Sequence, residues 1–206
     1  MDQQPLVALG APVALERLAD VAHLAHPHEV LEGLAAHDLR AACTNGLIAH
    51  PAGILQGVDQ LFTGKVELGQ GILTALSIIA ADELDVALDQ IGMVSATALE
   101  GPDEGMTSSS ISVQDSGSAI RHACAEVRYL ALQRAAQAHQ LDILSLRVNE
   151  GRFKSAEGQD LGDYWHWLQD LNLMREYEGL SRPQPYSELT LHGRGKVPRV
   201  DLPDKI

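Results

Sequence analysis

Two short stretches of the sequence carry residue types suited to binding a small polar ligand. The first is Leu68–Gly69–Gln70–Gly71, which stands where a strand-like run gives way to a helix-like run. Glycines let the backbone approach a ligand closely, and unpaired amide groups at a helix start favour an anion. The amide of Gln70 both donates and accepts, which suits a ring edge, and Thr74 adds a hydroxyl one turn later. The stretch matches neither the Walker loop nor GxGxxG, so an ordinary strand-to-helix turn is the alternative.

The second stretch is Met106–Ser112, in which no charged residue interrupts a run of hydroxyl side chains. These side chains are Thr107, Ser108, Ser109, Ser110 and Ser112. Such a loop can wrap a phosphate or a polar heterocycle without lysines, although a solvated linker has a similar composition. A helix expected directly after the loop would point its positive end the same way. Two such loops, each leading into a helix, predict one shared anion-bearing ligand.

The elements that must position these loops follow from apolar spacing. Residues 71–85 and 116–139 repeat apolar side chains at helical period, and residues 53–64 and 91–97 are strand-like, the former with a bulge expected at Gly57. Short strands at 143–148 and 152–154 and a small helix starting near Asp160 or Gly162 complete the pattern. Strands that alternate with two long helices predict an α/β (α+β) fold. We expect a helical segment at 1–50, a main α/β domain at 51–178 and an extended, proline-rich arm at 179–206.

Composition limits the function classes. The formal net charge of −13 and pI of about 5.0 argue against binding to nucleic acid or an anionic membrane, and no apolar run approaches the ~18 residues of a membrane span. Cys43 and Cys124 are expected to be small buried side chains. A reducing cytoplasm fits this composition, and export together with a partner stays open.

Three other clusters are interpreted as structural. The histidines at 23, 26 and 28 lack further metal ligands and are expected at the surface. The acidic residues at 82, 83 and 85 are expected to form a solvated helix end, because neighbouring helical positions point in different directions. The aromatic residues at 164, 165 and 167 are expected to pack rather than to stack on a substrate.

Three ordered blocks of the sequence resemble the molybdopterin-binding subunit of the xanthine dehydrogenase/aldehyde oxidase family. They are TGKVELGQGILTALSIIAADELDV (63–86), DEGMTSSSISVQDSGSAIRHACAEVR (103–128) and GKVPRVDLPDKI (195–206). The resemblance is strongest to the branch with isoquinoline and nicotinate dehydrogenases, and it does not extend to residues 1–50. It implies hydroxylation of a carbon in an N-heteroaromatic ring, or of an aldehyde, with oxygen from water and electrons leaving through iron–sulfur clusters.

The resemblance also implies cofactor contacts for both loops. The turn that touches the pyranopterin maps onto Leu68, Gly69, Gln70 and Gly71, with leucine replacing the usual methionine. The loop that holds the pterin and its phosphate maps onto Thr107, Ser109, Ser110, Ile111 and Ser112. The cofactor implied is molybdopterin, with its mononucleotide and cytosine dinucleotide forms both open.

Two expected family features are missing from the sequence. No Gly-Glu loop carries the catalytic glutamate, since Asn149–Phe153 is not that loop, and there are no cysteines for [2Fe–2S] clusters. The resemblance therefore implies a small subunit completed by a large molybdopterin-binding chain and a [2Fe–2S] chain, with a flavin or cytochrome subunit also open. The alternatives are a non-catalytic structural or maturation subunit, an aldehyde-oxidising member of the family, and a stand-alone domain for another anionic ligand.

Overall fold

The computed structural model describes residues 59–95, 104–108, 110–171, 173, 179–193 and 197–201. These all belong to one compact unit of residues 36–206. The predicted helical segment at 1–50, the bulge at Gly57, Cys43, the three N-terminal histidines and Ser109 lie outside the described residues.

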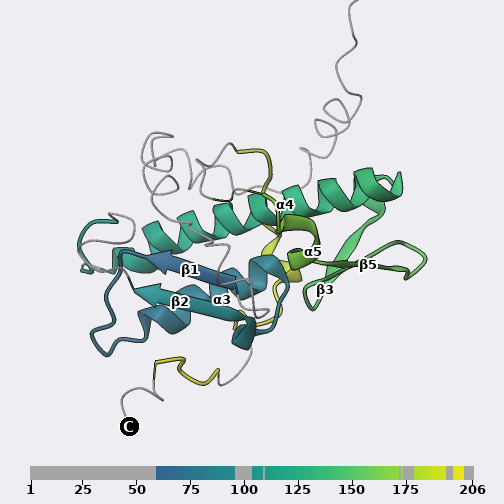
Figure 1. Cartoon of the computed structure of the whole chain (residues 1–206). Helices are drawn as coiled ribbons and strands as arrows, with labels where there is room; N and C mark the ends of the chain where they lie inside the picture. The colour runs from purple at the N-terminus through teal and green to yellow at the C-terminus, as the bar shows by residue number, and fades with distance from the viewer. Residues whose placement is uncertain are drawn as a thin grey trace, which may run out of the picture. The chain divides into compact units, whose positions relative to one another are not determined.

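The described chain is a mixed α/β structure, as predicted. Its helices and strands are β1 (Asp59–Thr63), α3 (Ile72–Leu84), β2 (Ile91–Ser95), α4 (Ser118–His139), β3 (Arg147–Asn149), β4 (Arg152–Lys154), β5 (Asp160–Asp163) and α5 (Tyr164–Leu168). Strands β1 and β2 are parallel and are connected through α3, whereas β3, β4 and β5 form an antiparallel sheet. Figure 1 shows α4 running from the first sheet to the second. Both ligand-binding candidates therefore follow the carboxyl ends of parallel strands.

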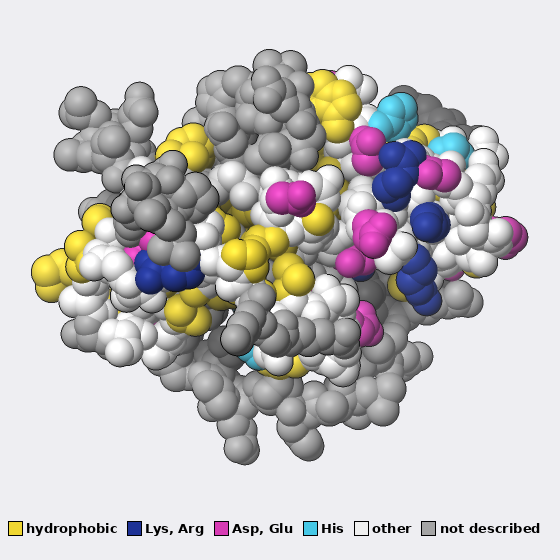
Figure 2. Space-filling model, turned by 90° about the horizontal axis from the view of Figure 1, so that it is seen from below, with side chains coloured by type: hydrophobic (Ala, Val, Ile, Leu, Met, Phe, Trp, Pro, Cys, Tyr) yellow, Lys and Arg dark blue, Asp and Glu magenta, His cyan; other side chains and the backbone are white. Residues whose placement is uncertain are grey.

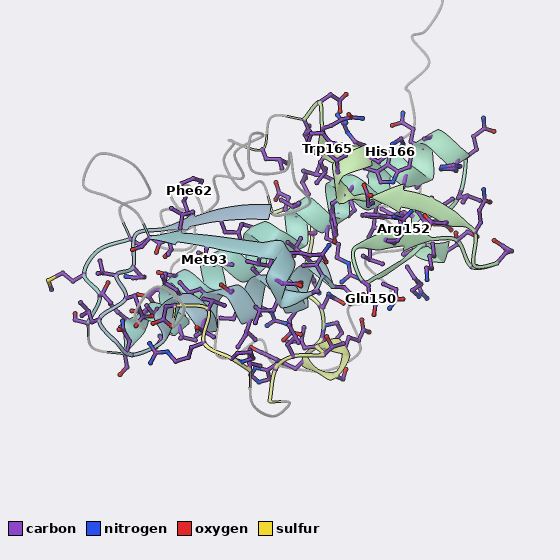
Figure 3. All side chains as sticks on the ribbon, turned by 60° about the horizontal axis from the view of Figure 1, so that its bottom comes forward. Phe62, Met93, Glu150, Arg152, Trp165 and His166 are labelled. Atoms are coloured by element: carbon purple, nitrogen blue, oxygen red, sulfur yellow. The ribbon has the colours of Figure 1, made fainter. Side chains whose placement is uncertain are left out.

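One hydrophobic cluster joins the helices to both sheets. Helix α3 contributes Ile72, Leu76, Ala80 and Leu84, and α4 contributes Ile120, Cys124 and Ala131, all of them buried as their spacing predicted. Of the aromatic residues expected to pack, Tyr164 and Trp167 do so, whereas Trp165 is 37% exposed. Figure 3 shows Phe62 projecting from β1 on the face of the sheet away from α3.

Three predicted boundaries were wrong. The chain is already helical from Ile111, and a π-helical turn, Val113–Gly117, leads into α4. Residues Ile143–Ser145 form a 3₁₀ turn rather than part of a strand. Residues Asp160–Asp163 are strand β5, and the short helix begins only at Tyr164 because the Asp163 side chain accepts from the amide of His166.

Gly117, the last residue of the π-helical turn, packs closely against α3. A Cβ atom added at Gly117 would lie 2.9 Å from Cδ1 of Ile79, well inside van der Waals contact. The glycine thus lets the start of α4 pack closely on α3, and this close packing favours helix despite the serine- and glycine-rich sequence.

The acidic end of α3 is buried, so the expectation of a solvated helix end was wrong. Asp82 and Glu83 are 4% and 1% exposed. The carboxylate of Asp82 accepts from the amides of Thr190, Leu191 and His192 at 2.6 to 2.8 Å. Glu83 accepts from the amide of Gln184 at 2.8 Å and from Arg121 at 3.3 Å. Two helical carboxylates thereby hold residues 184–192, part of the predicted arm, against α3.

Within the described part of the chain, no helix combines the length and apolarity needed to cross a bilayer. The same residues contain no cluster of three or more His, Cys, Asp or Glu side chains arranged to hold a metal ion.

Candidate ligand-binding site

The glycine turn before α3 requires glycine at two positions. Gly69 and Gly71 have φ angles of 105° and 81°, in the left-handed region that other residues rarely adopt. A Cβ atom at Gly69 would meet nothing within 4 Å, so the restriction there is conformational rather than steric. The turn therefore presents bare backbone at the carboxyl end of β1, the edge of a parallel sheet where ligands commonly bind.

The amides of Gly69 and Gly71 in this turn are already bonded, which differs from the sequence prediction of unpaired groups. One carboxylate oxygen of Glu67 accepts from the amides of Gly69 and Gly71 at 2.8 and 2.9 Å, and the other accepts from Leu73 at 3.3 Å. Burial raises the pKa of Glu67, but the hydrogen bonds from Gly71, Gly69 and Leu73 outweigh burial and hold the pKa below its ordinary 4.5. An internal carboxylate thus occupies the anion position that the sequence assigned to a ligand.

Gln70 is exposed, but its amide first stabilises its own turn. The side-chain oxygen accepts from the amide of Leu68 at 2.6 Å, and Nε2 donates to the carbonyl of Val66 at 2.9 Å. A primary amide has a second N–H and a second lone pair. Gln70 can therefore hold the turn and still offer a donor and an acceptor to a ligand.

The described end of the arm closes over the same turn. Arg199 donates to the carbonyl of Gly69 at 2.9 Å and approaches Glu67 at 3.4 Å, while Asp201 accepts from it at 2.6 and 3.0 Å. The hydroxyl of Thr74, expected to face a ligand, accepts the amide of Val200 at 3.0 Å. Thr74 is therefore an anchor for the arm.

The second predicted loop lies directly beside the first. The amide of Val66 donates to the hydroxyl of Thr107 at 2.9 Å. The ammonium of Lys65 donates to the carbonyls of Glu104 and Met106 at 2.5 and 3.2 Å. These bonds join residues 64–71 to residues 104–108, so the two loops predicted to share one ligand lie side by side.

The hydroxyl residues of the second loop differ in exposure. Ser108 and Ser110 are exposed, Thr107 is half-buried, and Ser112 is buried at 9% exposure in the first helical turn, next to the half-buried apolar side chain of Ile111. Ser110 has a φ of 60°, an uncommon conformation for a residue with a Cβ atom. The structure therefore leaves Ser108 and Ser110 as the exposed hydroxyls of the described loop.

Large apolar side chains are exposed beside these polar groups. Leu68 and Met106 are 73% and 77% exposed, and Val66 and Val113 are 46% and 49% exposed. The site thus combines apolar contact area with hydroxyl, amide and backbone groups, as organic ligand sites do. Figure 2 shows that another part of the surface is charged instead, with acidic and basic side chains interspersed at the right of the view.

Four residues that the sequence analysis missed position the two loops: Lys65, Glu67, Glu104 and Arg199. A glutamate just before a helix start was a usable signal for Glu67, because such a carboxylate can reach the free amides. Burial raises the pKa of Glu104 above its ordinary 4.5, and a hydrogen bond from the Thr63 hydroxyl opposes the rise. Nothing in the pattern around Lys65 indicated a buried side chain.

Comparison with known proteins identifies relatives of this chain. A family described as "Molybdopterin cofactor-binding domain" matches residues 55–195. A subunit of nicotinate dehydrogenase from Pseudomonas putida (strain KT2440) is 33% identical over 149 residues, which make up 72% of this chain and 12% of that protein. The chain therefore spans only about an eighth of the length of this relative.

Solved structures give weaker likenesses. A CO dehydrogenase from Oligotropha carboxidovorans matches with a TM-score of 0.48 and 22% identity, over 56% of this chain and 14% of that one. Quinoline 2-oxidoreductase from Pseudomonas putida 86 matches with a TM-score of 0.44 and 18% identity, over 65% and 17%.

Proposed function

This chain belongs to the family of molybdopterin cofactor-binding domains, and we propose that its two joined loops bind the organic part of a molybdenum cofactor. The observation that carries this proposal is the direct bonding of residues 64–71 to residues 104–108 at the carboxyl ends of parallel strands. A ligand lying across this edge would contact both loops at once.

The residues of the two loops fit different parts of such a cofactor. Because Glu67 fills the anion position before α3, we assign the glycine turn, Leu68–Gly71, to the uncharged pterin ring. Gln70 would pair with the ring edge, and the exposed side chain of Leu68 would cover part of a ring face. The phosphate would be held by the hydroxyl loop at the start of the second helical segment, through Thr107, Ser109, Ser110, Ile111 and Ser112.

The bound cofactor would supply the redox chemistry of the complex, and this chain would bind and orient it. The buried network under the loops fixes the backbone, and the exposed apolar side chains exclude water from the ring. We assign no proton transfer to this chain. Its contribution is the preorganised half of a cofactor site.

The remaining assignments concern the complete enzyme. We propose a heteromeric hydroxylase acting on an N-heteroaromatic compound, with the catalytic glutamate on a large partner chain and [2Fe–2S] clusters on another. Support comes from the 33% identity to a polypeptide that is named as a subunit of nicotinate dehydrogenase. The strongly exposed Leu68 and Met106 would be covered by the cofactor and the large chain, and residues 179–206 would also contact a partner.

A second candidate function is a purely structural role in such a complex, with loops that hold no cofactor. One observation favours it, because Glu67 and Gln70 satisfy the turn from within and so stabilise it without a ligand. The two candidates differ in what the exposed loop side chains do.

The test compares Gln70→Ala with Gln159→Ala, the same substitution at an exposed position near β5. Each variant is purified with its partners, and molybdenum and pterin are quantified per complex. Cofactor binding predicts that Gln70→Ala loses occupancy about tenfold, equivalent to about 1.4 kcal/mol, whereas Gln159→Ala keeps it. Full occupancy and full activity in Gln70→Ala would favour the structural role.

A further inference from the structure

A lysine is buried beneath the two loops. The side chain of Lys65 is 0% exposed, and its ammonium donates to the carbonyl oxygens of Glu104 and Met106. Burying an ammonium is costly unless acceptors surround it. The free-energy cost of burying Lys65 is therefore offset by hydrogen bonds that fix two backbone carbonyls of the neighbouring loop in place.

The lysine belongs to a network that joins three segments. The hydroxyl of Thr63 accepts from the amide of Lys65 at 3.2 Å and donates to the Glu104 carboxylate at 2.7 Å. The hydroxyl of Ser95 donates to the carbonyl of Lys65 at 2.8 Å. Thr63 and Ser95 are the last residues of β1 and β2. The network thus ties the ends of both parallel strands to the loop that starts at Glu104.

The carboxylate of Glu104 belongs to the same network. Burial raises its pKa above the ordinary 4.5, while the hydrogen bond from Thr63 and the positive charge of Lys65 oppose the rise. Residues 104–108 are therefore held by hydrogen bonds from Lys65 and Thr63 and by the bond from the Val66 amide to the Thr107 hydroxyl.

We propose that Lys65 is a positioning residue that couples the two loops so that they present one ligand-binding surface. This inference rests on the proposed function. Because the ammonium is fully buried, it does not touch a ligand on that surface and acts through the carbonyls that it holds. Without a donor at this position, the carbonyls of Glu104 and Met106 lose their partner and turn toward water, and the loop moves away from the glycine turn.

The test uses the full chain with Lys65→Met, Lys65→Arg and the control Lys154→Met on β4, far from the loops. Amide hydrogen exchange of residues 104–108 and of Val66 is measured in the free chain. Binding is then titrated in the cofactor-depleted complex of the chain with its partner chains, with molybdenum cofactor released from a donor enzyme, and is detected as oxidised pterin.

We expect Lys65→Met to accelerate exchange in residues 104–108 at least tenfold and to weaken cofactor binding about tenfold, while exchange in α4 is unchanged. Lys65→Arg, which keeps the charge and the donors, restores part of both effects, and such rescue is not expected if the position needs only apolar volume. Unchanged loop exchange or unchanged affinity in folded Lys65→Met overturns the proposal.

Two further outcomes keep the inference separate from the proposed function. A wild-type complex with the partner chains that binds no cofactor overturns the proposed function, and the exchange data alone then decide whether Lys65 couples the loops. If Lys65→Met does not fold, Thr63→Val and Thr63→Ser replace it. Thr63→Val must then accelerate amide exchange in residues 104–108, and Thr63→Ser, which keeps the hydroxyl, must not. Equal exchange rates in both variants overturn the coupling.

Discussion

The internal carboxylate of Glu67 makes a direct prediction about the glycine turn. Replacing it by glutamine keeps the size of the side chain and one acceptor oxygen. It removes the negative charge of the carboxylate that accepts from the amides of Gly69, Gly71 and Leu73. We expect the turn to stay folded in Glu67→Gln but to open much more often.

The magnitude follows from the bonds that lose charge assistance. Two short bonds each lose about 1 kcal/mol, the difference between a hydrogen bond to a charged group and one to a neutral group. Loss of charge at the start of α3 adds about 0.5 kcal/mol, and the solvent-exposed ion pair with Arg199 adds little. Because the turn lies at the surface, we expect about 2 kcal/mol, or roughly thirtyfold faster local opening.

Amide hydrogen exchange at Gly69, Gly71 and Leu73 measures this opening. Exposed Glu188 provides a matched control through Glu188→Gln. The pH dependence gives a second readout. The pKa of Glu67 is lowered from 4.5, so its stabilising contribution is present above pH 4.5 and is lost as the pH falls through its folded-state pKa. The difference between wild type and Glu67→Gln should therefore shrink below pH 4.5.

Two results would refute this reasoning. Equal exchange of the three amides in wild type and Glu67→Gln would show that the carboxylate does not hold the turn. A difference between the two proteins that grows as the pH falls below 4.5 would contradict the direction of the pKa shift.

Three further predictions concern the scaffold around the site. Asp82→Asn should accelerate amide exchange in residues 190–192 and lower the urea unfolding free energy by about 2 to 4 kcal/mol, because three backbone donors lose a buried carboxylate; the exposed control Asp89→Asn should have little effect, and similar losses in both variants would contradict this role. Leu76→Ala, at a fully buried position, should cost about 2 to 5 kcal/mol in the same assay, and a loss below ~1 kcal/mol would mean that the α3 core is misassigned. The pKa of Asp160 is about 2 because Arg152 bonds it, so its stabilising contribution is lost as the pH falls from 3.8 to about 2; Arg152→Met should raise this pKa toward 3.8 in an NMR titration, and an unchanged pKa would exclude Arg152 as the cause.

The parts of the fold that were predictable depend on local spacing. Helix α3 was predicted because Ile72, Leu76, Ala80 and Leu84 recur at helical period, and it differs from the prediction by one residue at each end. The glycine turn was predictable because Gly69 and Gly71 are the residues that tolerate its backbone angles. In both cases the physical cause lies within a few residues of its effect.

The contacts that could not be predicted join distant parts of the chain. Asp82 accepts from amides more than 100 residues later in the chain. Almost every residue type has a backbone N–H, so the sequence does not show which amides will bond to this carboxylate. Lys65 was missed for the same reason, since its acceptors are the carbonyls of Glu104 and Met106. The two candidate loops were predicted from composition and resemblance, but the contacts that hold them together depend on tertiary structure.

The most direct measurement of the central claim is amide exchange of this chain in its complex with the partner chains, with and without molybdenum cofactor, followed across both loops. One shared surface predicts that residues 68–71 and 107–112 gain protection together, with one apparent dissociation constant, while β3 to β5 do not change. Protection confined to one loop, or found only around the three-stranded sheet, would contradict the account.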